Sequence, residues 1–377
     1  MPIHHKIAGV VVLCAVILGL TLPDVRERNT SGKEAARAGS SSRTTQPSSR
    51  APADRPVNGQ ASPVPSSPGA SATPSAPATI AAAPGAAAVK ANELGEVPVL
   101  MYHRIMPKAE LSLDRTVKEF REEATRLAQE GYVPITAAEF VSGRFNIPAG
   151  RHPVVLTFDD STPGHFALDP SGKPKPDTAV AILMEVAQKH PGFRPVATFY
   201  LNKDMFGLGP QAPAGLRWLL QHGFELGNHT VTHPDLSSMS KEGVHKEIGG
   251  MESQILQQAG VHTTTLAYPF GSVPKKRAWA LSKAGEWNFT GVFLAGWKPS
   301  ESPFDTKFDP FAITRVRSEG KIKENDCKQF CSTAWLDTLA KNPATRYTSD
   351  GDPETISFPR TEEDRLGKAF RARGRMY

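Results

Sequence analysis

The chain of 377 residues is poor in cysteine and lacks the glycine-rich loops that bind nucleotides. Its 3 Cys include no CxxC pair, which excludes a disulfide-dense scaffold and offers neither a zinc ribbon nor a redox pair. No GxGxxG loop follows a candidate strand, and no GxxxxGK[ST] loop occurs. Nucleotide binding of those two kinds is therefore not expected.

The chain also has no large excess of charge of either sign. The 44 Lys+Arg and 38 Asp+Glu give a formal net charge of +6, which is no argument for a nucleic-acid partner but is compatible with work near an anionic cell surface. Hydrophobic residues make up 39% of the chain and charged residues 22%. This is ordinary for a globular protein and excludes a wholly disordered chain or a multispan membrane protein.

The N-terminus has the pattern of an export signal. A weakly basic start is followed by an apolar run from Ile7 to Leu22, which ends at Pro23. Because no convincing small-x-small cleavage site follows, the pattern favours a signal anchor over a cleaved signal peptide. Residues 1–28 are therefore predicted to be the only membrane contact of an exported protein, either membrane-anchored or secreted.

Large apolar side chains are almost absent from residues 29–95, which consist mainly of Ser, Ala, Pro, Gly and Thr. Such a segment cannot bury enough surface to offset chain entropy, so it is predicted to be a disordered linker. A spacer behind an export segment implies that the domain reaches something outside the membrane. The ordered domain is expected over residues 96–377.

From residue 96 onward, short apolar segments alternate with amphipathic ones, which predicts parallel βαβ units. The candidate strands are 97–102, 153–158, 196–201, 224–227, 265–268, 289–293 and 311–316. The candidate helices are 116–130, 177–189, 214–222, 241–258 and 275–284. About seven repeats in this length favour an α/β barrel over an open sheet.

Polar residues follow two of these strands directly. Asp159 and Asp160 come after 153–158, and His229 and His233 come after 224–227, where a (β/α) barrel carries its active site. Two histidines and one carboxylate can form a metal site that leaves positions open for water and substrate. Because adjacent aspartate side chains diverge, we expect one to bind the metal and the other to act as a base.

Taken together, these motifs resemble the polysaccharide deacetylases of carbohydrate esterase family four. The matching segments are Thr157–Asp160 (TFDD), His229–His233 (H-[ST]-x-x-H) and Pro269–Gly271, with further likeness in Ala197–Tyr200 and in Met101–Arg104. The last of these resembles a subgroup that begins with a Tyr-His strand end. The resemblance extends roughly from Val97 to Val316.

The resemblance implies a distorted (β/α)7 barrel that binds a divalent metal, usually Zn²⁺, through Asp160, His229 and His233. It further implies that Asp159 is the catalytic base and that the backbone N–H of Phe270 stabilises the oxyanion. The implied substrate is an N-acetylated, GlcNAc-containing polysaccharide such as peptidoglycan, poly-N-acetylglucosamine or a chitin-like polymer, and O-deacetylation stays open. Two other functions also stay open: a non-catalytic carbohydrate-binding barrel, and a metal-dependent hydrolase of another amide or ester.

Two positions of the family pattern are not filled by the usual residues. The Arg that often precedes the third motif and pairs with the base is replaced by Ala267, and Arg104 is a candidate substitute. No His follows His262, so the late histidine that often serves as general acid is missing. His103 is the candidate acid, with a structural hydrogen bond as its alternative role, and His165 is the weaker candidate.

Two further groups of residues allow alternative interpretations. Cys327 and Cys331 are four residues apart, so in an exported protein they form either a local disulfide or two free thiols. Trp279, Trp287 and Trp297 are expected in the core, or lining a groove that binds sugar.

Overall fold

The computed structural model describes residues 81–82, 84–318, 320 and 326–377. The predicted export segment and most of the predicted linker therefore lie outside the described residues. None of the described helices is both long and apolar enough to cross a membrane.

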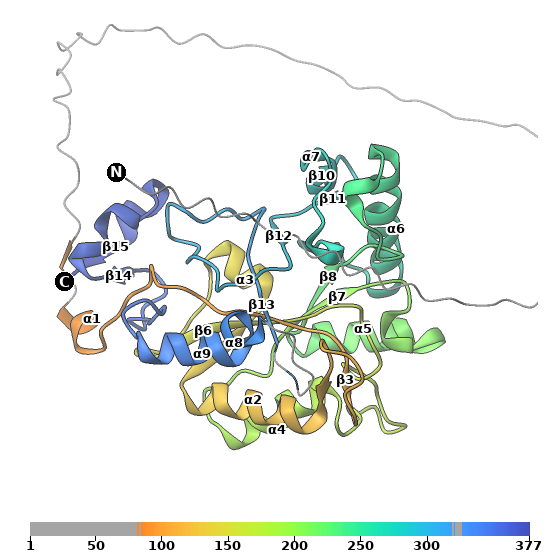
Figure 1. Cartoon of the computed structure of the whole chain (residues 1–377), viewed down its shortest axis with the longest axis horizontal. Coiled ribbons are helices and arrows are strands. Elements are labelled where there is room, and N and C mark those ends of the chain that lie inside the picture. Colours follow the sequence, from red (N-terminus) through yellow and green to blue (C-terminus); the bar gives the residue numbers. More distant parts are fainter. Residues whose placement is uncertain (1–80, 83, 319, 321–325) are drawn as a thin grey trace, which may run out of the picture. The chain divides into compact units, whose positions relative to one another are not determined.

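Parallel strands form the centre of the domain (Figure 1). Among the described residues the largest sheet has eight strands, and its main path runs β12-β9-β8-β7-β6-β2-β13, with β5 paired to β6 beside that path. These strands are β2 Val99–Tyr102, β5 Tyr132–Ile135, β6 His152–Phe158, β7 Thr198–Leu201, β8 Glu225–Asn228, β9 Thr265–Ala267, β12 Gly291–Phe293 and β13 Val316–Arg317. All of their pairings are parallel.

One short segment connects the two ends of this path. Phe293 at the end of β12 forms a parallel bridge with Ile313. Further along the same segment, Val316 pairs with Leu100 of β2. The strands therefore follow one another in chain order and return to the first strand, as in a (β/α) barrel. Arg315 lies inside this closing segment.

Helices follow the strands. The longer ones are α2 Val117–Gln129, α4 Ala179–Lys189, α5 Ala212–Gln221, α6 Lys241–Ala259 and α9 Ser332–Lys341. Of these, α2, α4 and α6 begin with side-chain N-caps. Thr116 and Glu119 form a reciprocal capping box at the start of α2. At the end of α6, Gly260 takes a left-handed φ of 78°. On its buried side, α2 places Phe120 against Tyr102 and Phe158, the last residues of two barrel strands.

The remaining elements are short. The helices are α1 Pro84–Ala88, α3 Ala137–Ser142, α7 Ala278–Leu281 and α8 Cys327–Phe330. The strands are β1 Ala81–Ala82, β3 Ile105–Met106, β4 Arg115–Thr116, β10 Ser282–Lys283, β11 Trp287–Asn288, β14 Ile356–Phe358 and β15 Gly374–Met376. The small sheet β1-β15-β14 joins the first and last described parts of the chain.

Two expected boundaries differ from the structure. Ordered structure begins before residue 96, because α1 is formed and Ala91 and Leu94 are completely buried. The helix expected over 275–284 is reduced to α7. It is followed by the antiparallel pair β10–β11, whose turn uses Gly285 at a φ of 75°.

The start of the domain is held by a buried carboxylate. The Glu93 side chain accepts hydrogen bonds from the Ser357 N–H at 2.7 Å and the Tyr347 hydroxyl at 3.1 Å. Glu93 is only 3% exposed. Burial, with a smaller contribution from Asp350, raises the pKa of Glu93 to about 8.

This raised pKa predicts a pH-dependent contribution to stability. Between pH 4.5 and about 8, Glu93 holds more of its proton in the folded state than in the unfolded state. The free energy of unfolding that it contributes therefore falls as pH rises through this window. Glu93→Gln keeps the shape without the charge, so relative to wild type it should gain stability toward pH 8 and little near pH 5. Urea denaturation at several pH values measures this difference.

The exposed Glu354 provides a matched control, because Glu354→Gln removes an equivalent charge from the surface. A stability difference between Glu93→Gln and wild type that does not change with pH would contradict the prediction.

Candidate metal centre and active site

Three possible metal ligands come together at the carboxyl ends of β6 and β8. Asp160 follows β6, and His229 and His233 follow β8. The Nε2 atoms of His229 and His233 each lie 3.6 Å from Asp160 Oδ1, and one ligand atom from each of the three residues lies within 4.8 Å of the others. The sequence-predicted ligand set is therefore assembled in space.

The hydrogen bonding of His229 fits a metal ligand. Its Nδ1 lies 2.8 Å from the Ala267 carbonyl oxygen, so Nδ1 carries the proton and Nε2 presents a lone pair. That Nε2 is buried and has no hydrogen-bond partner among the described residues. A buried polar atom without a partner requires an explanation, and two imidazoles with one carboxylate form a donor set that suits zinc.

Neighbouring elements fix the backbone turn that carries both histidines. Thr230 and His233 take positive φ values of 67° and 57°, which are unfavourable for residues with a side chain. Glu247 of α6 accepts hydrogen bonds from the Thr232 N–H and hydroxyl at 2.8 and 2.9 Å. Asn202 donates to the His229 carbonyl at 3.0 Å. Strained backbone that is held by its surroundings in this way is typical of functional sites.

Asp159 lies beside the ligand set and is paired with Arg315. Nη1 and Nη2 of Arg315 donate to the two carboxylate oxygens, each at 2.7 Å, and both side chains are almost completely buried. Burial raises the pKa of Asp159, but Arg315 and His229 outweigh burial, and the pKa lies well below its usual range. Asp159 is therefore held as a carboxylate, with Oδ2 3.8 Å from His229 Nε2.

Arg315, and not the candidate Arg104, pairs with Asp159, so the candidate named from the sequence was wrong. Arg104 pairs instead with Asp114 through two hydrogen bonds of 2.7 Å. Arg315 is oriented further by the Leu294 carbonyl, which accepts from Nε at 2.8 Å. The available sequence signal was one charged residue inside an otherwise uncharged strand candidate, 311–316.

His103 and Phe270 line the same pocket as the ligand set. This cavity of about 420 Å³ is also lined by Asp159, Asp160, His229, His233 and Arg315. The Phe270 ring is 70% exposed and lies 4.4 Å from the His233 ring, centroid to centroid. Burial lowers the pKa of His103, with Asp159 and Asp160 acting in the opposite direction, so the ring is mainly neutral at pH 7.

His165, the weaker candidate for the acid, lies elsewhere. It is completely buried and is not among the residues that line the pocket. Its Nε2 contacts the His103 carbonyl oxygen, and its ring packs on Phe158. His165 therefore supports the backbone of His103 from beneath the site.

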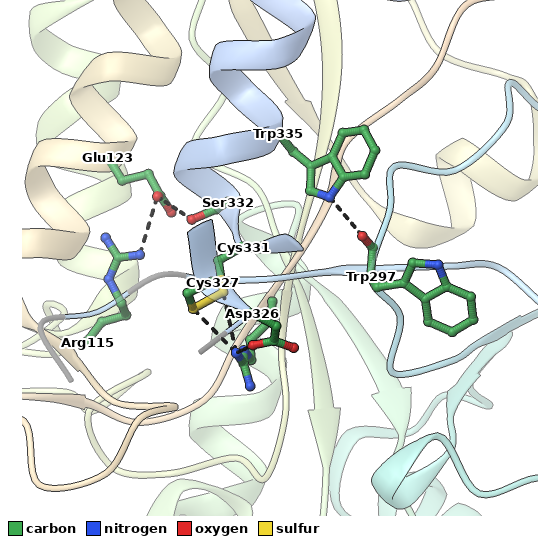
Figure 2. The surroundings of a disulfide bond; sticks show 9 residues. Arg115, Glu123, Trp297, Asp326, Cys327, Cys331, Ser332 and Trp335 are labelled. Atoms are coloured by element: carbon green, nitrogen blue, oxygen red, sulfur yellow. Dashed lines mark hydrogen bonds and ion pairs between the residues drawn. A yellow bond between two sulfur atoms is a disulfide. The ribbon is translucent and has the colours of Figure 1, made fainter. Parts of the chain in front are cut away.

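A disulfide borders one wall of the pocket. Cys327 and Cys331 are bonded (Figure 2), which decides between the two alternatives that the sequence left open. Asp326 and Phe330, which lie next to the two cysteines in the chain, line the pocket. Arg317 donates to Asp326 at 2.7 Å and also contacts both sulfur atoms. The disulfide thus fixes the turn that carries two pocket residues.

A tryptophan at the pocket is held by α9. Trp335 Nε1 donates to the Trp297 carbonyl at 2.8 Å (Figure 2). Trp297 lines the pocket with 59% of its surface exposed, whereas Trp287 is buried. Of these two tryptophans, Trp297 is the one available to a substrate, because its ring is exposed and its backbone is fixed.

Comparison with known proteins relates this site to a family. Residues 146–286 match the family model described as polysaccharide deacetylase. A chitooligosaccharide deacetylase of Bradyrhizobium is 31% identical over 117 residues, which are 31% of this chain and 43% of that protein. A peptidoglycan-N-acetylglucosamine deacetylase of Listeria monocytogenes is 27% identical over 126 residues, 33% of this chain and 23% of that one. A solved Streptococcus pyogenes deacetylase in complex with acetate superposes with a TM-score of 0.49 and 21% identity, covering 63% and 98% of the two chains.

The parallel strand order and the Asp-His-His set define an α/β barrel protein with a candidate hydrolytic metal site. The part of the chain over residues 146–286 is similar to the polysaccharide deacetylases, a family of hydrolases. It spans less than half the length of the curated relatives that it matches. The family match includes the ligand set and Asp159, whereas His103 and Arg315 lie outside the matched residues.

Proposed function

We propose that the protein is a metal-dependent deacetylase of an N-acetylated, GlcNAc-containing polysaccharide outside the cell. One observation carries this proposal: Arg315 holds Asp159 as a buried carboxylate directly beside the Asp160, His229 and His233 set. A barrel that only binds carbohydrate has no need of a charged base at this position. The deacetylase family match favours an acetylated polysaccharide over another amide or ester.

In the proposed reaction, each group has a separate task. A divalent cation held by Asp160, His229 and His233, with Zn²⁺ the best match to these donors, would polarise the acetyl carbonyl and acidify a water molecule. Asp159 takes the proton of the attacking water. The backbone N–H of Phe270 donates to the acetyl oxygen as negative charge develops there. Acetate and a free amine on the sugar are the products.

The proposed substrates and location follow from the family and from the N-terminal pattern. Peptidoglycan, poly-N-acetylglucosamine and chitin-like polymers all present the required N-acetyl group. Residues 1–28 would export the protein and provide its only membrane contact, and residues 29–80 would serve as the spacer. The enzyme would then act at the cell surface or outside it, either anchored or secreted, with no nucleic-acid partner.

Acetate release from N-acetylglucosamine oligomers and from peptidoglycan tests the proposal, with bound metal measured in the same preparations. We expect release to stop on chelation, to return with Zn²⁺, and to be absent in His229→Ala together with the metal. Simple aryl acetates serve as the comparison substrate. If the protein binds metal and oligosaccharide but releases no acetate from any of these substrates, the non-catalytic alternative is correct.

We further propose His103 as the general acid that protonates the leaving amine. His103→Asn should lower turnover by about 10²-fold or more, the usual contribution of a positioned acid, without changing bound metal. Because burial lowers the pKa of His103 below its usual value of about 6.5, the ring loses its proton at lower pH than a free histidine. The rate should therefore already decline as pH rises in the range below about 6.5. A pH–rate profile of wild type and variant tests this.

The structural role of His103 predicts a different result. A variant that loses thermal stability but retains turnover and the decline with rising pH would show that His103 only supports the site. His190→Asn, at the C-terminal end of α4 and outside the pocket, is the matched control and should change neither quantity.

A further inference from the structure

A second cavity lies at the opposite end of the barrel from the metal centre. It has a volume of about 480 Å³ and includes His152, the first residue of β6, among its lining residues. The active-site pocket begins just after Phe158, the last residue of the same strand. At the usual rise per residue, the length of β6 separates the two sites by roughly 20 Å.

Two cationic side chains line this cavity without carboxylate partners. Lys90 and Arg346 are among its lining residues, which include no Asp or Glu. Within the described part of the chain, neither Lys90 nor Arg346 forms an ion pair. The Arg346 guanidinium lies 5.6 Å from the centre of the Tyr132 ring, and its Nε is buried without a hydrogen-bond partner. A buried cationic donor without an acceptor is unfavourable, so an anionic ligand would stabilise this arrangement.

His152 adds a hydrogen-bond acceptor. It is 6% exposed, and its Nδ1 lies 2.8 Å from the Tyr347 carbonyl oxygen, so Nδ1 carries the proton. Burial, followed by the charge of Arg346, lowers the pKa of His152 to about 4. The ring is therefore neutral at pH 7, and Nε2 has a lone pair that can accept a hydrogen bond from a hydroxyl group.

The rest of the lining is apolar or rigid. Val89, Pro343 and Pro359 contribute apolar surface. The Tyr377 ring also lines the cavity, and its hydroxyl donates to the Ala91 carbonyl at 2.8 Å. A fixed ring with proline and valine beside it can pack against the C–H groups of a sugar. The cavity volume is within the range of small-ligand sites.

We propose that this cavity binds an acidic sugar unit, a pyranose with a carboxylate, of an anionic polysaccharide. Lys90 and Arg346 would bind the carboxylate, His152 would accept from a hydroxyl, and the apolar wall with Tyr377 would contact the ring. Such a site would hold the domain on an acidic polymer. The inference goes beyond the proposed deacetylase activity and does not depend on it.

Calorimetric titration of the full-length protein in detergent with tri-galacturonate tests the proposal. This probe carries no acetyl group, and its methyl ester is a neutral ligand of the same shape. We expect the acid to bind and the methyl ester to bind at least about tenfold more weakly, the loss expected from one charged contact. Inorganic phosphate, titrated in parallel, should bind more weakly than the acid because it offers no sugar ring.

Substitutions test whether tri-galacturonate binds in this cavity. Arg346→Gln and Lys90→Gln should each weaken tri-galacturonate binding by about tenfold or more. Arg371→Gln removes the same charge from an exposed side chain outside the cavity and should leave affinity nearly unchanged. Asp159→Asn should also bind tri-galacturonate with wild-type affinity, because the active-site pocket is separate from this cavity. Lys90 is exposed, so its variant keeps the test valid if Arg346→Gln does not fold.

Three results would each overturn the inference. The first is unchanged affinity in both Lys90→Gln and Arg346→Gln. The second is loss of binding in Asp159→Asn, which would place the sugar in the active-site pocket. The third is phosphate binding as tight as that of tri-galacturonate, which would show a simple anion site.

Discussion

Asp159→Asn should lower the rate of acetate release by about 10³-fold or more while the protein still binds its metal. General-base catalysis typically contributes 10²–10⁴-fold, and an asparagine amide cannot take the proton of the attacking water. The metal should remain because Asp160, His229 and His233, which form the ligand set, are unchanged. Single-turnover acetate release and the zinc content of the same sample measure the two effects separately.

Asp160→Asn is the matched control, since it makes the same chemical change at the neighbouring residue. It should lose metal and activity together, because Asp160 Oδ1 is the atom that both histidines approach. If Asp159→Asn keeps both its metal and a rate within about tenfold of wild type, Asp159 is not the base. Loss of metal in Asp159→Asn would instead make Asp159 a ligand.

Local motifs predicted well which residues come together at the candidate site. Asp159, Asp160, His229 and His233 were all recognisable because they follow apolar strands directly, and the ends of parallel strands meet at one edge of the sheet. His103 was placed at the same edge by the same reasoning, and it lines the pocket. Each of these residues could be located from its immediate sequence neighbours.

The partner of the base could not be found in this way. Arg315 is 156 residues from Asp159 in the chain, and only the closure of the barrel brings the two together. The family pattern directed attention to the position of Ala267 and then to Arg104, which is engaged by Asp114. A pairing of this kind depends on the strand order and the register of β13 with β2, which composition does not reveal.

The start of the domain was missed for a different reason. Residues 81–95 are rich in Ala and poor in large apolar side chains, a composition that predicts a linker. Yet Ala86 and Ala91 are buried, and β1 pairs with β15 at the far end of the chain. Each small side chain contributes little apolar surface. Whether such a segment is ordered therefore depends on the strand with which it pairs, and local sequence patterns do not identify that strand.

Arg315→Met should cause the second large effect, on both stability and turnover. The substitution introduces an unbranched apolar side chain in place of the guanidinium. It leaves the Asp159 carboxylate buried without its cation. Breaking a buried pair by removing one partner costs about 3–5 kcal/mol. Turnover should fall as well, because the carboxylate loses two hydrogen bonds that orient it. Urea denaturation and acetate release measure the two effects.

A double-mutant cycle separates the ion pair from simple packing. If the damage comes from an uncompensated charge, Asp159→Asn in the Arg315→Met background should restore part of the lost stability. Compared with Arg315→Met, Arg315→Lys restores the positive charge but not the bidentate hydrogen bonding to Asp159. It should therefore restore stability better than turnover. Arg365→Met, which removes the partner of the buried Asp305, should lower stability without lowering the turnover of folded protein. Additive losses in the cycle would contradict the coupling of Arg315 and Asp159, and with it the view that barrel closure completes the active site.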